Sequence, residues 1–480
     1  MAHDYAPILP QIVVLAGAML LVLLEPFTPP ERKRQLGRLA VVTAAAAAIV
    51  LSLEGLHPRR TVFHGMFVAD GFSYFFQWLF FVIAAVSSLI SMRFNERESI
   101  DRGEYYSLLL LASSGMSLMA ASGDLVLTFL GLEILSMATY VLAGFKRTDA
   151  RGNEAALKYF LLGSFASAFL LYGIAPIYGS AATTNYALIR QVTALQGEVP
   201  ATLRVGLGLL LVGFGFKVAI VPFHAWAPDV YEGAPTPVTA FMTVGPKAAG
   251  FAALVRVLVE ALPALERDWT AVLWVSSLAT MVVGNVVALL QTNVKRLLAY
   301  SAIAHAGYIL IGLVAHNRTG LQGVLFYLLV YTIMNLGAFS IILSFSRKGD
   351  SRVNLVDYAG LGRRDPVAAA VLSVCLISLA GLPPMAGFTA KLYLFSAAIQ
   401  DGYVGLAIVG VLTSVVSVFY YFRLMVVMYM QEPAAADAGP ERIGAPVMAI
   451  ALVSALAILW LGVFPTRFLD LASHSSLALK

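Results

Sequence analysis

The fold is decided by Phe223-His-Ala-Trp-Ala-Pro-Asp-Val-Tyr-Glu-Gly-Ala-Pro-Thr-Pro237, a polar and proline-rich stretch at the end of a long apolar run. A helix that crosses a bilayer needs about 20 mostly apolar residues, and a proline inside it removes a backbone hydrogen bond. Irregular backbone at membrane depth is tolerated only where protein or a wet cavity surrounds it. The stretch therefore predicts a broken membrane-spanning helix beside a transport pathway.

A second interrupted run covers residues 366–398, which as one continuous helix would be about 50 Å long. Its middle reads Gly381-Leu-Pro-Pro-Met-Ala-Gly387, and no continuous helix accommodates this easily. The motif G-F-x-x-K occurs beside both interruptions, as Gly213-Phe-Gly-Phe-Lys217 and as Gly387-Phe-Thr-Ala-Lys391. Two interrupted spans in corresponding halves are the best sequence indication of a transport site.

The two halves share a further spacing. Tyr140 and Tyr159 lie 19 residues apart in the first half, and Tyr308 and Tyr327 lie 19 residues apart in the second. Together with the shared motif, this order predicts two repeats of five spans, spans 4–8 and spans 9–13. Because each repeat has an odd number of spans, we expect the two to be inverted relative to each other across the membrane.

The composition is typical of a protein that lies in a bilayer. Of 480 residues, 59% are hydrophobic and 12% are charged, whereas a soluble domain carries roughly 25% charged residues. A soluble enzyme is therefore excluded, and the short charged runs between apolar stretches do not indicate nucleic-acid binding. The single cysteine, Cys375, excludes a disulfide framework and a cysteine-ligated cluster. Phosphate-binding, dinucleotide-binding and zinc motifs are absent from the sequence, so we expect neither a cofactor nor a metal in this chain.

Fourteen apolar stretches are long enough to span a membrane. We interpret the first as a retained helix rather than a signal peptide, because no basic leader precedes it. The predicted division is 1–104 for spans 1–3, 105–260 for the first repeat, 261–430 for the second repeat and 431–480 for span 14. The predicted spans are 8–25, 37–53, 71–92, 105–121, 125–145, 155–178, 203–232, 237–258, 270–290, 297–315, 321–345, 366–398, 404–430 and 446–464.

The lysines and arginines between the spans predict the orientation. Loops that follow odd-numbered spans carry eighteen of these residues, whereas the remaining loops and the two tails carry eight. Since loops on the cytoplasmic side are enriched in lysine and arginine, both termini are predicted on the outer, periplasmic side. The loops are too short to form a folded domain outside the membrane.

Lysine and arginine are distributed differently inside the spans. Four of the nine lysines, Lys158, Lys217, Lys247 and Lys391, fall inside predicted spans, whereas only two of the 23 arginines do, both near span ends. A buried lysine can release its proton, but an arginine stays charged. The pattern favours proton transfer within the bilayer. The alternative is a set of structural ion pairs between helices.

One acidic residue, Glu133, lies in the middle of span 5, with Ser136 on the same helix face. A lone carboxylate at this depth would be neutral unless a cation lies nearby, and Lys217 is the natural candidate. Lys158 follows Glu154 by four residues, so it either forms a local surface pair or takes part in proton transfer.

The remaining candidates each have a functional and a structural interpretation. Lys247 ends a row of threonines that either packs against a neighbouring helix or lines a hydrated path. His224 is either a proton relay or a hydrogen-bonded core residue. The second repeat has no counterpart of Glu133, and Lys295 lies at a span end, where an anchoring role competes with a relay role. The possible relay residues are Ser301, His305, Tyr308, Tyr331 and Lys295.

These motifs, together with Glu154-Ala-Ala-Leu-Lys-Tyr-Phe-Leu-Leu-Gly163, resemble the subunit N family of bacterial NADH-quinone oxidoreductase (respiratory complex I), the counterparts of mitochondrial subunit 2. The resemblance covers essentially the whole chain. It implies an all-α polytopic membrane protein of about fourteen helices, with inverted repeats and with helices 7 and 12 discontinuous. It also implies proton translocation driven by quinone reduction in other subunits. The functional positions of the family fall on Glu133, Lys158, Lys217, His224, Lys247 and Lys391.

The resemblance also implies where cofactors and partners lie. NADH, FMN, the iron–sulfur clusters and quinone would bind in other subunits. The partners would be the neighbouring antiporter-like subunits and the small helical subunits of the complex, together with the lipid bilayer. The location would be the bacterial inner membrane.

Several alternatives stay open at this point. The nearest is an antiporter-like subunit of a Mrp-type cation/proton antiporter or of a membrane-bound hydrogenase, although those relatives usually lack the Tyr231-Glu232 pair found here. A stand-alone secondary transporter or a scaffold with inactive ionisable residues belongs to a different class. A stand-alone carrier should work when it is expressed alone, whereas a subunit of complex I should need its partners.

Overall fold

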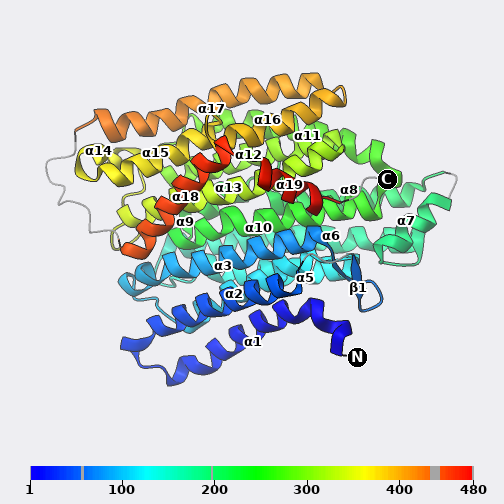
Figure 1. Ribbon diagram of the computed structural model, residues 1–480, viewed down its shortest axis with the longest axis horizontal. Coiled ribbons are helices and arrows are strands. Elements are labelled where there is room, and N and C mark those ends of the chain that lie inside the picture. The colour runs from blue at the N-terminus through cyan, green and yellow to red at the C-terminus, as the bar shows by residue number, and fades with distance from the viewer. Residues whose placement is uncertain (1, 56–58, 196–197, 433–443, 478–480) are drawn as a thin grey trace.

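The computed structural model describes residues 2–55, 59–195, 198–432 and 444–477, and it is helical almost throughout (Figure 1). Twelve helices in these ranges are long and apolar enough to cross a membrane. This confirms the predicted all-helical membrane fold. The count of fourteen spans, the inversion of the repeats and the four-part division stay predictions, and the last part, 431–480, includes residues outside the described ranges.

The helices follow the predicted spans closely. Their bounds are α1 Leu9–Leu24, α2 Arg34–Glu54, α3 Gly71–Arg97, α4 Gly103–Ala120, α5 Leu125–Ala143, α6 Ala150–Ala181, α7 Tyr186–Leu195, α8 Ala201–Val218, α9 Trp226–Gly233, α10 Thr236–Arg256, α11 Glu266–Ala288, α12 Val294–Ala315, α13 Arg318–Phe345, α14 Leu361–Arg364, α15 Pro366–Ala380, α16 Ala386–Gln400, α17 Val404–Met430, α18 Ala445–Val463 and α19 Thr466–Ser475.

Two predicted spans are not among the twelve long apolar helices. Predicted span 4 corresponds to α4, in which four serines lower the hydropathy. Predicted span 12 corresponds to α15 and α16, which have 15 residues each. Both stretches are nevertheless helical at the predicted positions.

The helix α10 forms the centre of the molecule, because every residue of this helix is buried. The neighbouring helices α12 and α13 are also buried over most of their length, whereas α1, α6 and α18 leave most of their apolar residues exposed. Figure 1 shows α1 at one edge of the bundle and α17 at the opposite edge, with α10 and α13 between them. A polar side chain on α10 is therefore far from both lipid and water.

Both predicted helix interruptions are present. In the first half, α8 ends at Val218 and α9 begins at Trp226. In the second half, α15 ends at Ala380 and α16 begins at Ala386. Each break leaves the last carbonyl groups of the preceding helix without partners from the helix itself, so other groups must hydrogen-bond to them.

Two kinds of element, a strand hairpin and short amphipathic helices, were not predicted. The strands β1 (Arg60–Val62) and β2 (Phe67–Ala69) form an antiparallel hairpin, and α7 and α19 are ten-residue helices with one polar face. In Figure 1 the hairpin and α7 lie toward the same end of the bundle as the start of α1. A search for stretches of about 20 apolar residues passes over such short elements.

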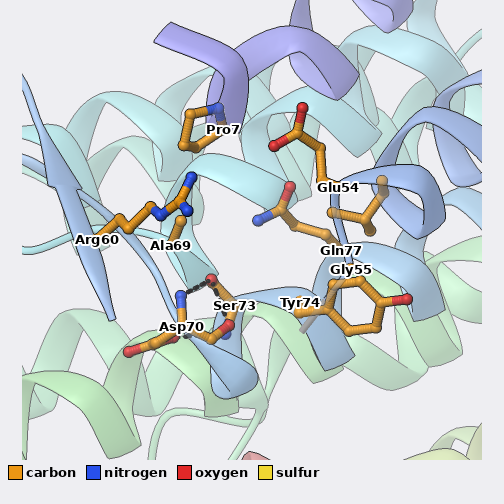
Figure 2. A pocket seen from close by; sticks show the side chains of 10 residues that line it. Pro7, Glu54, Gly55, Arg60, Ala69, Asp70, Ser73, Tyr74 and Gln77 are labelled. Atoms are coloured by element: carbon orange, nitrogen blue, oxygen red, sulfur yellow. Dashed lines mark hydrogen bonds between the residues drawn. The ribbon is translucent and has the colours of Figure 1, made fainter. Parts of the chain in front are cut away.

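A buried ion pair ties the start of α3 to the end of α10. Asp70 and Ser73 cap α3 reciprocally, each through a hydrogen bond of 2.9 Å to the other's side chain. Figure 2 shows this pair in the wall of a pocket that Arg60 and Gln77 also line. The fully buried Arg256 donates two hydrogen bonds to the Asp70 carboxylate, at 2.7 and 3.0 Å. Because the carboxylate pairs with it, the charged Arg256 guanidinium is tolerated inside the bundle.

Candidate functional site

The first buried lysine, Lys217, lies in the last turn of α8, directly before the break. Its side chain is only 5% exposed, and its ammonium donates a hydrogen bond of 2.9 Å to the Ser136 hydroxyl on α5. The same side chain packs against Gly250 of α10, where an added Cβ would lie 3.4 Å from the Lys217 Cγ. Gly250 follows Lys247 by three residues, so the Lys217 side chain meets α10 about one helical turn from Lys247.

Glu133 is held differently from the expected ion pair. It is half-buried on α5, and its carboxylate accepts a hydrogen bond from the Ser167 hydroxyl on α6. Among the described residues it forms no ion pair with Lys217 within 4 Å. Lys217 is nevertheless close enough to act electrostatically on Glu133, while its ammonium donates a hydrogen bond to Ser136, one helical turn along α5.

The second buried lysine, Lys247, lies in the middle of α10 and is 2% exposed. Its ammonium donates a hydrogen bond to the Ala302 carbonyl of α12 and lies 5.7 Å from the centre of the Tyr331 ring. The threonines one and two turns before it, Thr243 and Thr239, turn their hydroxyls to backbone carbonyls. Both threonine hydroxyls are therefore satisfied within the protein, and Lys247 is the charged residue of this row.

His305 on α12 forms a hydrogen-bonded cluster with tyrosines of the second half. Its Nδ1 lies 2.6 Å from the Tyr327 hydroxyl and its Nε2 lies 3.2 Å from the Tyr421 hydroxyl, which also contacts Ser301. Lys247 and Lys391 are both close enough to act electrostatically on this imidazole. A neutral imidazole donates from one nitrogen and accepts at the other, so His305 can take up a proton on one side and release one on the other.

The third buried lysine, Lys391, lies at the break between α15 and α16. Its ammonium donates hydrogen bonds to the carbonyls of Ala380 and Leu379, at 3.0 and 3.3 Å. These are carbonyls that the helix break leaves free, and the negative end of a helix dipole favours a cation there. The Tyr308 ring lies 4.6 Å from the ammonium. The helix break in the second half thus forms the lysine site.

In the first half, a different group hydrogen-bonds to the carbonyls at the helix break. The Trp226 indole nitrogen, rather than a lysine, donates a hydrogen bond of 2.9 Å to the Phe216 carbonyl of α8. The indole stacks on the Tyr159 ring with centroids 4.6 Å apart and planes 7° apart. Lys217 is consequently free to reach Ser136, and the two halves hold their lysines by different contacts.

Comparisons with known proteins identify the family of this chain. A family model described as NADH:quinone oxidoreductase/Mrp antiporter, transmembrane, matches residues 122–417. NADH-quinone oxidoreductase subunit N of Trichlorobacter lovleyi is 46% identical over 469 residues, which cover 98% of this chain and 96% of that protein. Its namesake from Paramagnetospirillum magneticum is 42% identical, with 98% and 97% covered. The chain belongs to the NADH-quinone oxidoreductase subunit N family.

Solved structures show the same fold. A chain of respiratory complex I from Thermus thermophilus with bound aureothin is 36% identical, with a TM-score of 0.82 over 97% of this chain and 99% of that chain. A chain of the Mrp complex from a Dietzia species is only 23% identical, with a TM-score of 0.87 over 100% and 98% of the two chains. The second likeness concerns the fold alone. Membership of the subunit N family rests on the sequence relatives.

Within this subunit N fold, two candidate residues lie apart from the three buried lysines. Lys158 is 45% exposed and pairs with Glu154 at 2.8 Å and with Asp229 at 3.0 Å, as expected for a surface pair. His224 is half-buried in the first break, and its Nδ1 has no hydrogen-bond partner among the described residues. Their roles in proton transfer stay predictions.

Four polar residues of the second half were missed in the sequence. The Asn285 amide of α11 donates a hydrogen bond of 3.0 Å to the Tyr308 hydroxyl, which contacts Thr413 at 3.3 Å. Tyr420 donates to the Asn285 oxygen at 3.1 Å, and Tyr421 contacts His305. The sequence signals that could have identified them are the amide inside the apolar helix α11 and the two adjacent tyrosines inside α17. Only the packing of α11 and α17 against α12 gave them a partner.

Lys295 contacts both halves of the chain. This buried lysine donates a hydrogen bond of 2.7 Å to the Ala234 carbonyl and pairs with Asp350 at 3.1 Å. Asp350 also accepts hydrogen bonds from Thr236, at the start of α10, and from Ser346. Burial alone would raise the pKa of the Asp350 carboxyl, but the Lys295 ammonium and these hydrogen bonds outweigh it and hold the pKa below its usual value.

We expect Asp350→Asn to lower the free energy of unfolding by about 3 kcal/mol near neutral pH, since it leaves the buried Lys295 unpaired. The folded-state pKa lies below the unfolded one, so the stabilisation is present above the unfolded value of 3.8 and is lost as pH falls through the folded value. The difference between variant and wild type should therefore shrink in acid. Thermal denaturation in detergent from pH 7 to pH 3 measures it, and a difference that stays constant with pH would contradict the assignment.

Proposed function

We propose that the chain translocates protons as a membrane subunit of NADH:quinone oxidoreductase, coupled to electron transfer from NADH to quinone in other subunits. The names of its full-length relatives support this function. The observation that carries it is the chain of three buried lysines, Lys217, Lys247 and Lys391, with His305 between the last two. Buried ionisable groups are costly in a membrane protein and are usually functional.

In the proposed mechanism the lysines exchange protons one after another. Lys217 would pass its proton toward Lys247, because the Lys217 side chain packs against α10 about one helical turn from Lys247. His305 then passes protons between its two ring nitrogens and the tyrosine hydroxyls that contact it. The α15 carbonyls stabilise the protonated form of Lys391, which would make this lysine the strongest proton acceptor of the second half.

We further propose that the redox chemistry lies outside this chain. NADH, FMN, iron–sulfur clusters and quinone would bind in other subunits, and both termini would face the periplasm of a bacterial inner membrane. Neighbouring membrane subunits would cover other exposed apolar faces, such as that of α17, where Val415 and Phe419 are each 65% exposed. A Mrp-type antiporter is the other candidate, but subunit N relatives at 42–46% identity favour complex I.

The test of this function is the Glu133→Ala variant in the assembled complex. We expect proton pumping and quinone reduction to fall together by roughly tenfold or more, the usual cost of losing a proton-transfer group. The reason is coupling, since a blocked proton path slows the redox reaction that drives it. NADH-driven acidification of inverted vesicles, normalised to assembled complex, measures the pumping.

Two further variants serve as comparisons. Ser301→Ala should have a mild effect, because Tyr421 contacts His305 directly and does not depend on the serine. Glu432→Gln, which removes a carboxylate whose side chain is 84% exposed, should pump like wild type. Full pumping by assembled Glu133→Ala at the wild-type redox rate would contradict a role for Glu133, and so would an equal loss in Ser301→Ala.

A further inference from the structure

A cavity of about 290 Å³ lies outside the chain of lysines, where the end of α3, the start of α4 and the end of α5 meet. It belongs to the membrane-surface end of these helices, since loops enter and leave there. Its polar wall includes Arg102, Glu104 and Arg147, and its apolar wall includes Leu108, Val141 and Phe145. The cavity therefore combines charges of both signs with an apolar surface.

The charged groups of this cavity are unused within the described part of the chain. One oxygen of the Glu104 carboxylate, Oε2, is buried without a hydrogen-bond partner. The side chains of Arg102 and Arg147 take part in neither an ion pair nor a hydrogen bond there. The neighbouring Lys146, by contrast, pairs with Glu98 at 2.7 Å. Buried polar groups are nearly always satisfied, so the unpartnered Glu104 oxygen points to a ligand. Arg102 and Arg147 are exposed and line the same cavity, so both guanidinium groups are available to that ligand.

The apolar wall continues into the membrane. Val141 is 54% exposed, and Met137, one turn further along α5, is also 54% exposed. Leu130 lies on the same face and is 47% exposed. A ligand with its head in the cavity could therefore lay an acyl chain along α5. This combination of a charged cavity and an exposed apolar helix face fits an amphiphile.

We propose that this cavity binds the headgroup of a phospholipid that carries a primary amine. The phosphate would pair with the Arg102 and Arg147 guanidinium groups, which match phosphate geometry. The ammonium would donate a hydrogen bond to the unpartnered Glu104 oxygen, and one acyl chain would cover Val141 and Met137. The ligand thus pairs all three charges at once.

Other occupants leave part of the site unsatisfied. A choline headgroup has no N–H to donate to Glu104, and a glycerol headgroup brings no cation. A basic side chain from a neighbouring subunit would pair with Glu104, but it would leave both arginines unpaired. The observed set of charges therefore favours an aminophospholipid over these three.

The experiment uses the assembled complex in vesicles of dioleoyl-phosphatidylcholine mixed with dioleoyl-phosphatidylethanolamine, or in vesicles of dioleoyl-phosphatidylcholine alone. A carbodiimide couples an adjacent carboxylate and primary amine into an amide and takes up the water that is lost. Peptide mass spectrometry then identifies what is attached to Glu104. We expect an ethanolamine-lipid adduct in the first vesicles and none in the second. A cross-link from Glu104 to a lysine of a neighbouring subunit would overturn the proposal.

A second measurement counts retained lipid by native mass spectrometry during detergent washing. The wild-type complex should retain about tenfold more ethanolamine lipid than choline lipid at this site, because one charge-assisted hydrogen bond changes the affinity by about that factor. Glu104→Gln should remove the preference, and the Arg102→Gln/Arg147→Gln variant should weaken both lipids alike. Arg363→Gln, at an arginine whose side chain is 70% exposed, is the control. If the Glu104→Gln variant and the Arg102→Gln/Arg147→Gln variant retained as much ethanolamine lipid as wild type and the control, the proposed site would be refuted.

Discussion

Lys217→Arg is expected to pump about as poorly as Lys217→Ala, with a loss of roughly 100-fold relative to wild type, the scale of a lost proton-transfer group. Arginine keeps the positive charge and about the same length, but its pKa above ~12 prevents it from releasing a proton during turnover. The geometry adds a second reason. Lys217 packs on Gly250 and reaches Ser136 through a single nitrogen, and a planar guanidinium does not fit the same contacts.

A lysine-to-arginine substitution at a partly exposed ion pair is the control, because there only the positive charge is needed and no proton is exchanged. Lys33 pairs with Glu25 and is 22% exposed, so Lys33→Arg should pump normally. NADH-driven acidification of inverted vesicles is the measurement, with the amount of assembled complex as the normalisation. If Lys217→Arg restored most of what Lys217→Ala loses, Lys217 would act as a fixed charge rather than as a proton carrier.

Gly381→Ala is the second substitution with a large expected effect. Gly381 ends α15 with φ +84°, and an added Cβ would lie 2.7 Å from Cδ and 3.0 Å from Nζ of Lys391. The methyl group must displace the lysine side chain and with it the two hydrogen bonds to the α15 carbonyls. We expect pumping to fall roughly tenfold or more, while the backbone strain alone costs about 1–2 kcal/mol.

Gly402 offers a matched control for this strain. It has a similar φ of +79°, and nothing lies within 4 Å of its added Cβ. Gly402→Ala should therefore show the same loss of thermal stability but keep wild-type pumping. Equal pumping losses in the two variants would show that the strain, rather than the position of Lys391, limits activity.

The sequence determined the membrane fold and the candidate residues. The apolar length of each span and the prolines of the two breaks act locally, because one helix must satisfy its own backbone whatever surrounds it. For this reason α8 and α15 end where the motifs predict. The same logic identified Lys217, Lys247 and Lys391, since a lysine within an apolar helix is costly wherever it points. The hairpin β1–β2 lacked any such signal.

The tertiary structure decided which groups these residues meet. Lys217 was expected to pair with Glu133, yet it contacts Ser136, while Glu133 contacts Ser167. The polar network of the second half depends on Asn285 and Tyr421, which come from helices far apart in the chain. Spacing along a helix fixes which face a side chain occupies. Its partner is set by how closely helices pack, as at Gly250 and Gly381, and that distance is a property of two helices together rather than of either sequence alone.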